Sequence, residues 1–223
     1  MNEKKKRLFQ KKITAYWHTD GRHHLAWRQT SDPWKLLVAE VLLRKTTSAQ
    51  AEVVFEELSK FTAGDTAKMP IHELERMLHP LGMSKVKAEQ LKEMAVKVKD
   101  ADLDQMESDE FLRSIRGVGR YISNSVRCIA FGIPAPALDT NMIRIIERVF
   151  GWRSERARAR EDKKLWQFAA TLVPENACRQ YNWGVLDFGA AVCTFRNPKC
   201  GICSLQEICD YYQKLAVQSS EQG

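Results

Sequence analysis

Hydrophobic side chains recur along this sequence at intervals of three and four residues, the spacing that places them on one face of an α-helix. The clearest case begins with Asp32 as a cap and Pro33 at the first helical position. Its apolar face comprises Trp34, Leu37, Val38, Val41 and Leu42. Similar helices are predicted over residues 51–61, 72–78, 88–98, 142–150, 164–173 and 183–192. No stretch of strand length alternates apolar and polar residues, so the sequence predicts an all-α fold.

The stretch 114–144 shows the clearest change of local structure. A Gly-Val-Gly sequence at 117–119 separates two predicted helices, and glycine permits positive φ and a close approach of the backbone. The helix predicted over 120–130 then begins with amide N–H groups that have no partner inside it. Such a helix start is a potential anion site, although glycines also make ordinary turns between packed helices. The next helix starts at Asp139, which can serve as its N-cap.

The composition describes a globular chain with a surplus of positive charge. The sequence has 223 residues, of which 44% are hydrophobic and 9% aromatic, enough to bury a core. Its net charge of +7 suits a phosphate-binding surface, although many basic proteins bind no nucleic acid. No apolar run approaches the ~20 residues of a membrane span. The basic segment 1–12 lacks the apolar core of a secretory signal, and we expect a solvated tail or a phosphate-contacting arm there. Without a secretory or transmembrane segment, we expect a cytoplasmic, nucleoid-associated protein with no membrane partner, and a monomer is the default expectation.

Four of the six cysteines gather near the end of the sequence with the spacing C-x6-C-x2-C-x5-C. They are Cys193, Cys200, Cys203 and Cys209. In the absence of a secretory signal, metal ligation by thiolates accounts for them better than disulfides do. Zinc sites usually combine two close pairs of ligands, whereas this spacing has one C-x2-C with a single cysteine on either side. The sequence therefore favours an iron–sulfur cluster over zinc.

Together these features resemble the endonuclease III superfamily of helix-hairpin-helix DNA glycosylases, whose members carry an iron–sulfur cluster. The resemblance rests on the glycine hairpin, the aspartate about twenty residues later and the cysteine spacing, and it extends over about residues 25–212. The segments EVLLRKTT, LGMSKVKAEQLKEMA, GVGRYISNSVRCIAFG and CRQYNWGVLDFGAAVC are most similar to the microbial thymine–guanine mismatch glycosylases. The adenine glycosylases are the next most similar group.

The resemblance implies two domains and a [4Fe-4S] cofactor. Residues 30–133 would form a six-helix barrel domain that contains the helix-hairpin-helix motif at about 108–131. Residues 1–29 and 134–223 would form an iron–sulfur cluster domain, with the four clustered cysteines as ligands. Double-stranded DNA with a mismatched or damaged base would lie across the groove between the domains, and the target nucleotide would be turned out of the stack.

The resemblance also implies catalytic roles. Asp139 matches the superfamily's catalytic aspartate, which would stabilise positive charge on the sugar or orient a water molecule. Bifunctional relatives carry a lysine where this chain has Tyr121, and a phenol cannot form the Schiff base that precedes strand cleavage. Glu40 matches a glutamate shared by the thymine-mismatch and adenine branches. Helical spacing alone favours an outward-facing Glu40, whereas the resemblance favours a residue that positions water or hydrogen-bonds the flipped base.

The residues expected at the DNA come from the hairpin and from two other turns. They are Gly117, Val118, Gly119, Arg120, Arg44, Lys45 and Met83. The hairpin residues would grip the backbone of one strand. Arg44 and Lys45 would face the vacated stack or the unpaired guanine. Met83 is a candidate apolar wedge between bases, with ordinary packing as the alternative.

The sequence therefore predicts a monofunctional DNA glycosylase that hydrolyses the N-glycosidic bond of thymine or uracil opposite guanine in base excision repair, without AP lyase activity. An adenine glycosylase acting opposite oxidised guanine is the first alternative. Against it, the sequence ends soon after Cys209, without the additional lesion-reading domain that such enzymes usually carry. A non-catalytic iron–sulfur DNA-binding protein is the second alternative, and the presence of both Asp139 and Glu40 argues against it.

Overall fold

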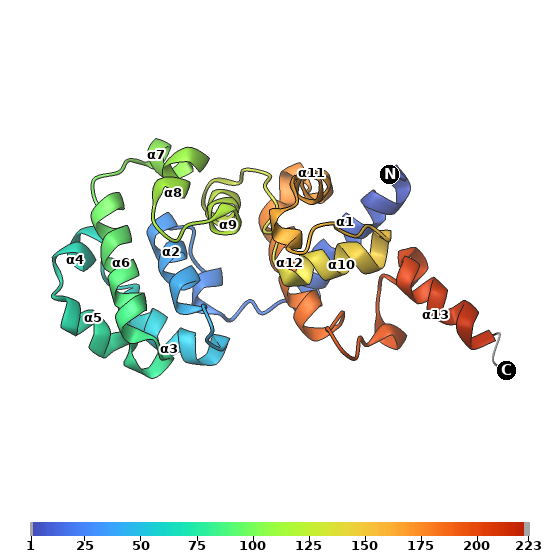
Figure 1. Ribbon diagram of the computed structural model, residues 1–223, viewed down its shortest axis with the longest axis horizontal. Helices are drawn as coiled ribbons and strands as arrows, with labels where there is room; N and C mark the ends of the chain where they lie inside the picture. Colours follow the sequence, from blue (N-terminus) through green and yellow to red (C-terminus); the bar gives the residue numbers. More distant parts are fainter. Residues whose placement is uncertain (1, 221–223) are drawn as a thin grey trace. The chain divides into compact units, whose positions relative to one another are not determined.

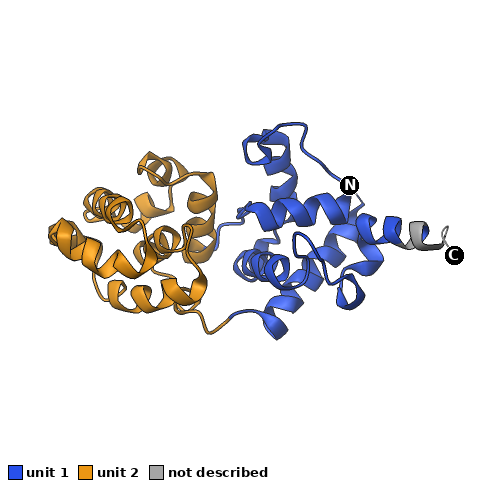
Figure 2. Cartoon of the chain, turned by 60° about the horizontal axis from the view of Figure 1, so that its bottom comes forward, with its two compact units in different colours: residues 1–22, 132–223 blue, residues 23–131 orange. Residues whose placement is uncertain are grey.

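The computed structural model describes residues 2–220 and divides the chain into two compact units (Figure 2). Residues 23–131 form one unit, here called the hairpin unit, and residues 1–22 with 132–223 form the other, called the cysteine unit. Every regular element assigned to the described residues is an α-helix or a 3-10 turn, so the all-α prediction is confirmed. None of the described helices is both long and apolar enough to cross a lipid bilayer. The assignment of a barrel domain to residues 30–133, with a cluster domain from the remainder, stays a prediction.

Three helices of the hairpin unit pack against one apolar helix, α2, and two more pack against α6. Its helices are α2 (Pro33–Leu42), α3 (Ser48–Leu58), α4 (Ala63–Lys68), α5 (Ile71–Leu78), α6 (Ser84–Val98), α7 (Leu103–Glu107), α8 (Asp109–Ser114) and α9 (Arg120–Phe131) (Figure 1). The helix α2 begins at Asp32, whose carboxylate accepts hydrogen bonds from the amides of Trp34 and Lys35. It is apolar on most sides because α3, α6 and α9 all contact it.

The cysteine unit is built from both ends of the sequence. Its helices are α1 (Glu3–Asp20), α10 (Thr140–Phe150), α11 (Lys163–Leu172), α12 (Cys178–Ala191) and α13 (Asp210–Ser220) (Figure 1). The helix α12 contacts both α1 and α10. Gly184 lets α1 come close, because a Cβ there would lie 2.5 Å from the carbonyl oxygen of Ile13. The fully buried rings of Phe9 and Tyr181 meet edge to face at the same contact.

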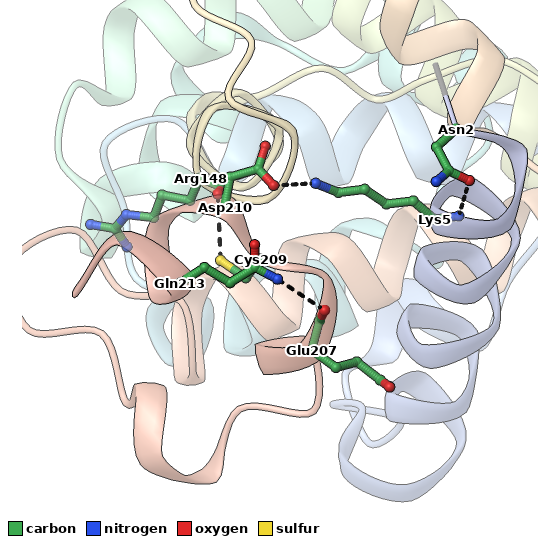
Figure 3. Close-up of polar contacts among 7 residues, drawn as sticks. All are labelled: Asn2, Lys5, Arg148, Glu207, Cys209, Asp210 and Gln213. Atoms are coloured by element: carbon green, nitrogen blue, oxygen red, sulfur yellow. Dashed lines mark hydrogen bonds and ion pairs between the residues drawn. The ribbon is translucent and has the colours of Figure 1, made fainter. Parts of the chain in front are cut away.

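The basic N-terminal segment is a helix with one buried face. Its buried residues lie four positions apart: Phe9, Ile13 and Trp17. Two of its lysines form ion pairs with residues near the end of the sequence, Lys5 with Asp210 and Lys12 with Glu207, both at 2.5 Å. Figure 3 shows the first of these pairs. The expectation of a solvated tail is therefore wrong, because α1 completes the core of the cysteine unit.

Candidate active site and cysteine loop

Asp139 stands at the start of α10, where the sequence predicts a cap. Its Oδ1 accepts a hydrogen bond from the backbone N–H of Met142 at 2.8 Å, which is N-cap geometry. Its Oδ2 accepts a second hydrogen bond, also at 2.8 Å, from the side-chain amide of Asn141. The carboxylate is therefore fixed in orientation by a donor at each oxygen, while the residue stays partly exposed.

The surroundings of Asp139 disfavour its charged form. Burial raises the pKa of Asp139 above its ordinary value, although hydrogen bonds from Met142 and Asn141 and the charge of Arg160 oppose this change. The helix start alone would have predicted the opposite direction. A carboxylate that has lost part of its hydration attracts a nearby positive charge more strongly than a fully hydrated one does. The site is thus suited to stabilising positive charge that develops beside it.

Residues 193–209, which carry the four clustered cysteines, are here called the cysteine loop. Asp139 is connected to this loop through two side chains that the sequence reasoning missed. Asn141, which donates to Asp139, accepts a hydrogen bond from Arg144 at 2.8 Å. Arg144 also donates to the main-chain carbonyl groups of Gly189 and Cys193, both at 2.7 Å. Position 189 requires glycine because a Cβ there would lie 2.5 Å from the Cβ of Asn141. The available sequence signal was the spacing of three between Asn141 and Arg144, which places them on one face of the helix.

Glu40 lies in the hairpin unit and faces α9. Its Oε1 accepts a hydrogen bond from Ser125 Oγ at 3.2 Å, and the side chain of Tyr121 is a second hydrogen-bond partner. Burial raises the pKa of Glu40 to about 7, against the opposing effects of Ser125, Arg44, Tyr121 and Arg28. The outward orientation expected from helical spacing alone is therefore wrong. Glu40 is a partly buried carboxyl group whose charge changes near neutral pH.

Two neighbours of Glu40, Arg28 and Ser125, are absent from the sequence-predicted set. Arg28 ends the 3-10 turn Ala26–Arg28, is buried, and places positive charge near Glu40. Ser125 follows Tyr121 by four residues in α9, so both hydroxyl groups lie on one face of the helix. That spacing was the sequence signal for Ser125. For Arg28 the signal was an arginine directly after an apolar, aromatic stretch.

The glycine hairpin joins α8 to α9. Gly117 has a φ of +83°, a conformation that favours glycine, and a Cβ on it would also force the end of the Gln90 side chain, 2.4 Å away, to shift. Gly119 has open space around it. Arg120, the first residue of α9, is exposed. Val118 is only 5% exposed and its N–H bonds within the hairpin, so its side chain packs into the unit.

Arg44 braces this hairpin. Its guanidinium donates hydrogen bonds to the carbonyl oxygen of Gly117 at 2.5 Å and to Oε1 of Gln90 at 2.7 Å. Lys45 and Met83 are both exposed, and their φ angles of +52° and +54° are in the left-handed region. Such conformations are uncommon for residues with long side chains and concentrate at functional sites. Contact of these three residues with DNA stays a prediction.

The four clustered cysteines line one pocket of the cysteine unit. Burial raises the pKa of Cys203 to about 11 and raises the pKa of Cys200 and Cys209, and neighbouring thiols add to each increase. These mutual effects show that the thiols lie near one another. Among residues 2–220, no three ligand side chains are grouped as a site for a single ion. Four thiols around one pocket fit an iron–sulfur cluster, whose cationic irons favour the thiolate form.

Arg148 connects the cysteine loop to α10. Its Nη1 donates to Sγ of Cys193 at 3.4 Å and to the carbonyl group of Thr194 at 2.6 Å, and its Nη2 donates to the carbonyl group of Phe195 at 2.8 Å. Its own carbonyl group accepts a hydrogen bond from Sγ of Cys209 at 3.4 Å (Figure 3). One residue of α10 therefore positions both the first and the last cysteine of the motif.

A basic cavity of about 1040 Å³ is lined by α10 from Thr140 onwards and by α13. Six cationic residues line it: Arg144, Arg148, Arg153, Arg158, Arg160 and Lys214. Two aromatic residues contribute as well, since Phe195 is 76% exposed and the guanidinium of Arg148 lies 5.1 Å from the centre of the Tyr211 ring. Cations and aromatic rings on one surface are the combination that binds nucleic-acid strands.

Comparison with known proteins places this chain among the DNA glycosylases that carry an iron–sulfur cluster. The family model for the HhH-GPD superfamily base excision DNA repair protein matches residues 38–170, and that for the iron–sulfur binding domain of endonuclease III matches residues 193–209. The chain belongs to the HhH-GPD superfamily, and its cofactor is a [4Fe-4S] cluster. The predictions of family, enzyme class and cofactor are confirmed.

Curated and solved relatives resemble the chain over most of its length. It is 40% identical to a thymine/uracil-DNA glycosylase of Pyrobaculum aerophilum, over 92% of both chains. It is 37% identical to a protein of the same name from Methanothermobacter thermautotrophicus, over 96% of this chain and 97% of the other. A solved structure of a thermostable thymine-DNA glycosylase superposes with a TM-score of 0.86 at 36% identity, covering 95% of this chain and 98% of that one.

Proposed function

We propose that this glycosylase removes thymine or uracil mispaired with guanine by hydrolysis and leaves the strand intact. The observation that carries the proposal is the contact between Tyr121 and Glu40. It puts a phenol, hydrogen-bonded to a carboxyl group, at the position that matches the lysine of strand-cutting relatives. A phenol cannot form an imine with the sugar, so water is the final nucleophile. The names of the two archaeal relatives, both thymine/uracil-DNA glycosylases, support the choice of base.

Asp139 acts on the sugar. Cleavage of the N-glycosidic bond builds positive charge on the sugar while negative charge collects on the departing base. The carboxylate of Asp139, fixed by Met142 and Asn141 and partly desolvated, stabilises that positive charge or orients the attacking water. Asparagine at this position would keep the capping geometry and remove the charge, which makes Asp139→Asn an informative variant.

Glu40 acts on the water or on the base. Thymine has no ring nitrogen as basic as those of adenine, so protonation of the base gives little advantage here. The hydroxyl groups of Tyr121 and Ser125 can each donate to Glu40 or accept from it, so the carboxyl group can gain or lose its proton without losing its partners. With a pKa of about 7, Glu40 is ionised in part of the molecules at neutral pH. In that form its carboxylate can accept a hydrogen bond from a water molecule and so position it.

DNA binding uses the hairpin, the basic cavity and the cysteine loop. Gly117, Gly119 and Arg120 would contact the phosphates of one strand through the start of α9. Cys193, Cys200, Cys203 and Cys209 would hold the [4Fe-4S] cluster, which when bound shapes the loop that carries Arg196 and Lys199. A mismatch lowers the cost of turning the target nucleotide out of the stack, and this contributes to selectivity.

The proposal is tested with four duplexes, which contain G·T, G·U, adenine opposite oxidised guanine, or only matched pairs. Each is incubated with purified protein, and gels are compared before and after alkali. We expect abasic product from G·T and G·U, visible as breaks only after alkali. Breaks without alkali would contradict the argument from Tyr121. Absence of abasic product on every duplex would favour a DNA-binding protein without catalysis.

Release of adenine is the second candidate, and one observation favours it. A carboxyl group with a pKa of about 7 can protonate a base, which is the role of such a group in adenine glycosylases. The chain is also 30% identical to an adenine DNA glycosylase of Mycolicibacterium smegmatis, over 85% of this chain and 65% of the other. Product from the adenine duplex alone would establish this candidate in place of the first.

A further inference from the structure

Lys87 is a buried lysine outside the groups described above. It lies in the first turn of α6, is 3% exposed, and has a pKa that burial lowers below the ordinary lysine value. Its Nζ donates a hydrogen bond to Oγ1 of Thr46 at 2.6 Å and another to the carbonyl group of Leu42 at 3.2 Å. Burying an ammonium group is unfavourable unless it is hydrogen-bonded, so these contacts are what keep the side chain inside the unit.

The first contact closes the turn around Lys45. An ammonium group can only donate, so the bond from Lys87 occupies a lone pair of the Thr46 hydroxyl and leaves its single proton for another acceptor. That acceptor is the carbonyl group of Arg44 at 3.0 Å, with the carbonyl group of Leu81 near by at 3.5 Å. The contact from Thr46 to Arg44 spans Lys45, the residue with the left-handed backbone.

The same lysine is attached to the turn that carries Met83. Its own N–H donates to the carbonyl group of Met83 at 3.0 Å. Gly82 and Met83 both have positive φ, +66° and +54°, and Leu81 precedes them. Lys87 therefore joins two turns, 43–46 and 81–83, which we name the eversion ridge. A left-handed methionine or lysine persists only where its surroundings determine the backbone. Here one residue contacts both turns, with its ammonium group at Thr46 and its backbone N–H at Met83.

We propose that Lys87 is a positioning residue for base eversion: it joins the two turns of the eversion ridge so that Lys45 and Met83 enter the DNA together. The inference rests on the proposed function. Met83 offers an apolar side chain that is 50% exposed, and Lys45, in the other turn, offers an exposed cation. An apolar wedge unstacks a base step, and a cation beside it holds the phosphate or the unpaired base. If the two turns separated, Lys45 and Met83 would both remain but would no longer be held at a fixed distance from each other.

The experiment compares Lys87→Met, which removes the ammonium group and keeps the length, with Lys87→Arg, which keeps the charge. Lys92→Met is the matched control, because Lys92 also lies on α6 and donates to a main-chain carbonyl group, that of Met69, outside the eversion ridge. All variants carry Asp139→Asn, so that DNA is bound without base release. Fluorescence of 2-aminopurine beside a G·T pair reports unstacking, and a duplex with a stable abasic analogue reports binding where no base must be turned out.

We expect Lys87→Met to reduce the fluorescence increase at the G·T pair by about tenfold and to leave affinity for the abasic duplex within about threefold of the parent. The fluorescence increase of Lys87→Arg should lie between those of Lys87→Met and the parent, and that of Lys92→Met should equal the parent's. In a Met83→Ala background, Lys87→Met should have a clearly smaller further effect, about threefold, because only the placement of Lys45 is then left to lose. If Lys87 only stabilised the fold, its loss would lower the fluorescence increase and the affinity for the abasic duplex by the same factor.

Equal losses on both duplexes, or a full additional effect in the Met83→Ala background, would overturn the proposal. Circular dichroism and the visible absorbance of the cluster verify the fold of each variant. If Lys87→Met fails to fold, Thr46→Val breaks the same link from its other end and takes its place. Failure of the proposed function is seen separately, as an absence of base release by the wild-type protein, and the fluorescence comparison still decides the role of Lys87.

Discussion

The two candidate carboxyl groups, one in each unit, differ in the donors that surround them. Asp139 in the cysteine unit accepts from a backbone N–H and a side-chain amide, which are groups that only donate in these contacts. Glu40 in the hairpin unit meets the hydroxyl groups of Ser125 and Tyr121, which can donate or accept. Burial raises the pKa of both carboxyl groups, so the donors rather than the burial distinguish them.

The difference indicates that the two carboxyl groups have different roles. A carboxyl group among fixed donors loses hydrogen bonds when it is protonated, so the contacts of Asp139 favour a permanent anion. A carboxyl group among hydroxyl groups keeps its partners in either state, so Glu40 is suited to handling protons. The predictions below test this contrast.

The largest effect is expected for Asp139→Asn. The amide keeps the N-cap hydrogen bond and removes the negative charge, so the fold should be retained while base release falls by about 10³-fold or more. Single-turnover rates on a G·T duplex measure the loss, and gel-shift affinity serves as the control. A rate near that of the wild type would end the assignment of Asp139 as the charge-stabilising group.

Glu40→Gln should have the next largest effect, about 10²-fold in rate, because a positioned acid or base contributes about that much. The wild-type rate should rise with pH through about 7, the pKa of Glu40, and level off above it, since the ionised form holds the water. The glutamine variant should lose this dependence. A rate that instead falls as pH rises through 7 would mean that the protonated form acts, as in adenine release.

Arg144→Leu should lower activity by about 10- to 100-fold, the usual range for a residue that holds a functional side chain in position without touching the reacting atoms. It removes the support of Asn141, and hence of Asp139, together with one bond to Cys193 and one to Gly189 in the last turn of α12. Visible absorbance after purification measures whether the cluster is retained. Arg148→Leu is a useful comparison, because Arg148 holds the same loop without contacting Asn141. Similar rates in the two variants would argue against transmission through Asn141.

Ser125→Ala should have a smaller and more specific effect. The serine hydroxyl lowers the pKa of Glu40, so its removal should move the midpoint of the pH–rate profile upward by about 0.5–1 unit. The plateau rate at high pH should change by only a few fold. An unchanged midpoint would mean that Glu40 does not govern the profile.

The smallest expected effect is on stability. The folded-state pKa of Glu40 is about 7, above the ordinary glutamate value of 4.5, so its ionisation opposes folding. The contribution of the protonated Glu40 side chain to the free energy of unfolding is therefore fully present below about pH 4.5 and is lost as pH rises through 7. Glu40→Gln should raise the Tm by a few degrees at pH 8 and leave it unchanged near pH 4.5. Equal shifts at both pH values would indicate a packing effect instead.

Local sequence patterns predicted the elements whose cause is local. The caps at Asp32 and Asp139 and the glycine at 117 depend on neighbouring residues, and the structure contains all three. The helix α1 was missed because its lysines dominated the composition of the segment, and the surface that covers Phe9 comes from α12, far along the sequence. Its apolar spacing was nevertheless present.

The site was predicted less completely because its contacts join distant segments. Periodicity in α2 could not show that α9 would cover Glu40, since that contact pairs residues 85 positions apart. The left-handed backbone of Met83 contradicts the preference of methionine, so no local rule predicts it. The roles of Asp139, Glu40 and Tyr121 came from resemblance to a family, and the geometry adds the supporting residues Arg28, Ser125, Asn141 and Arg144.

Construction of the cysteine unit from both ends of the chain has a consequence for biosynthesis. The apolar stripe of α1 leaves the ribosome long before its partner α12, which is completed only after Ala191 has been added. At bacterial or slower elongation rates this interval lasts roughly ten seconds or more, during which residues 23–131 can already fold. The nascent chain therefore carries a helix with an uncovered apolar face, to which a chaperone can bind until α12 has been translated.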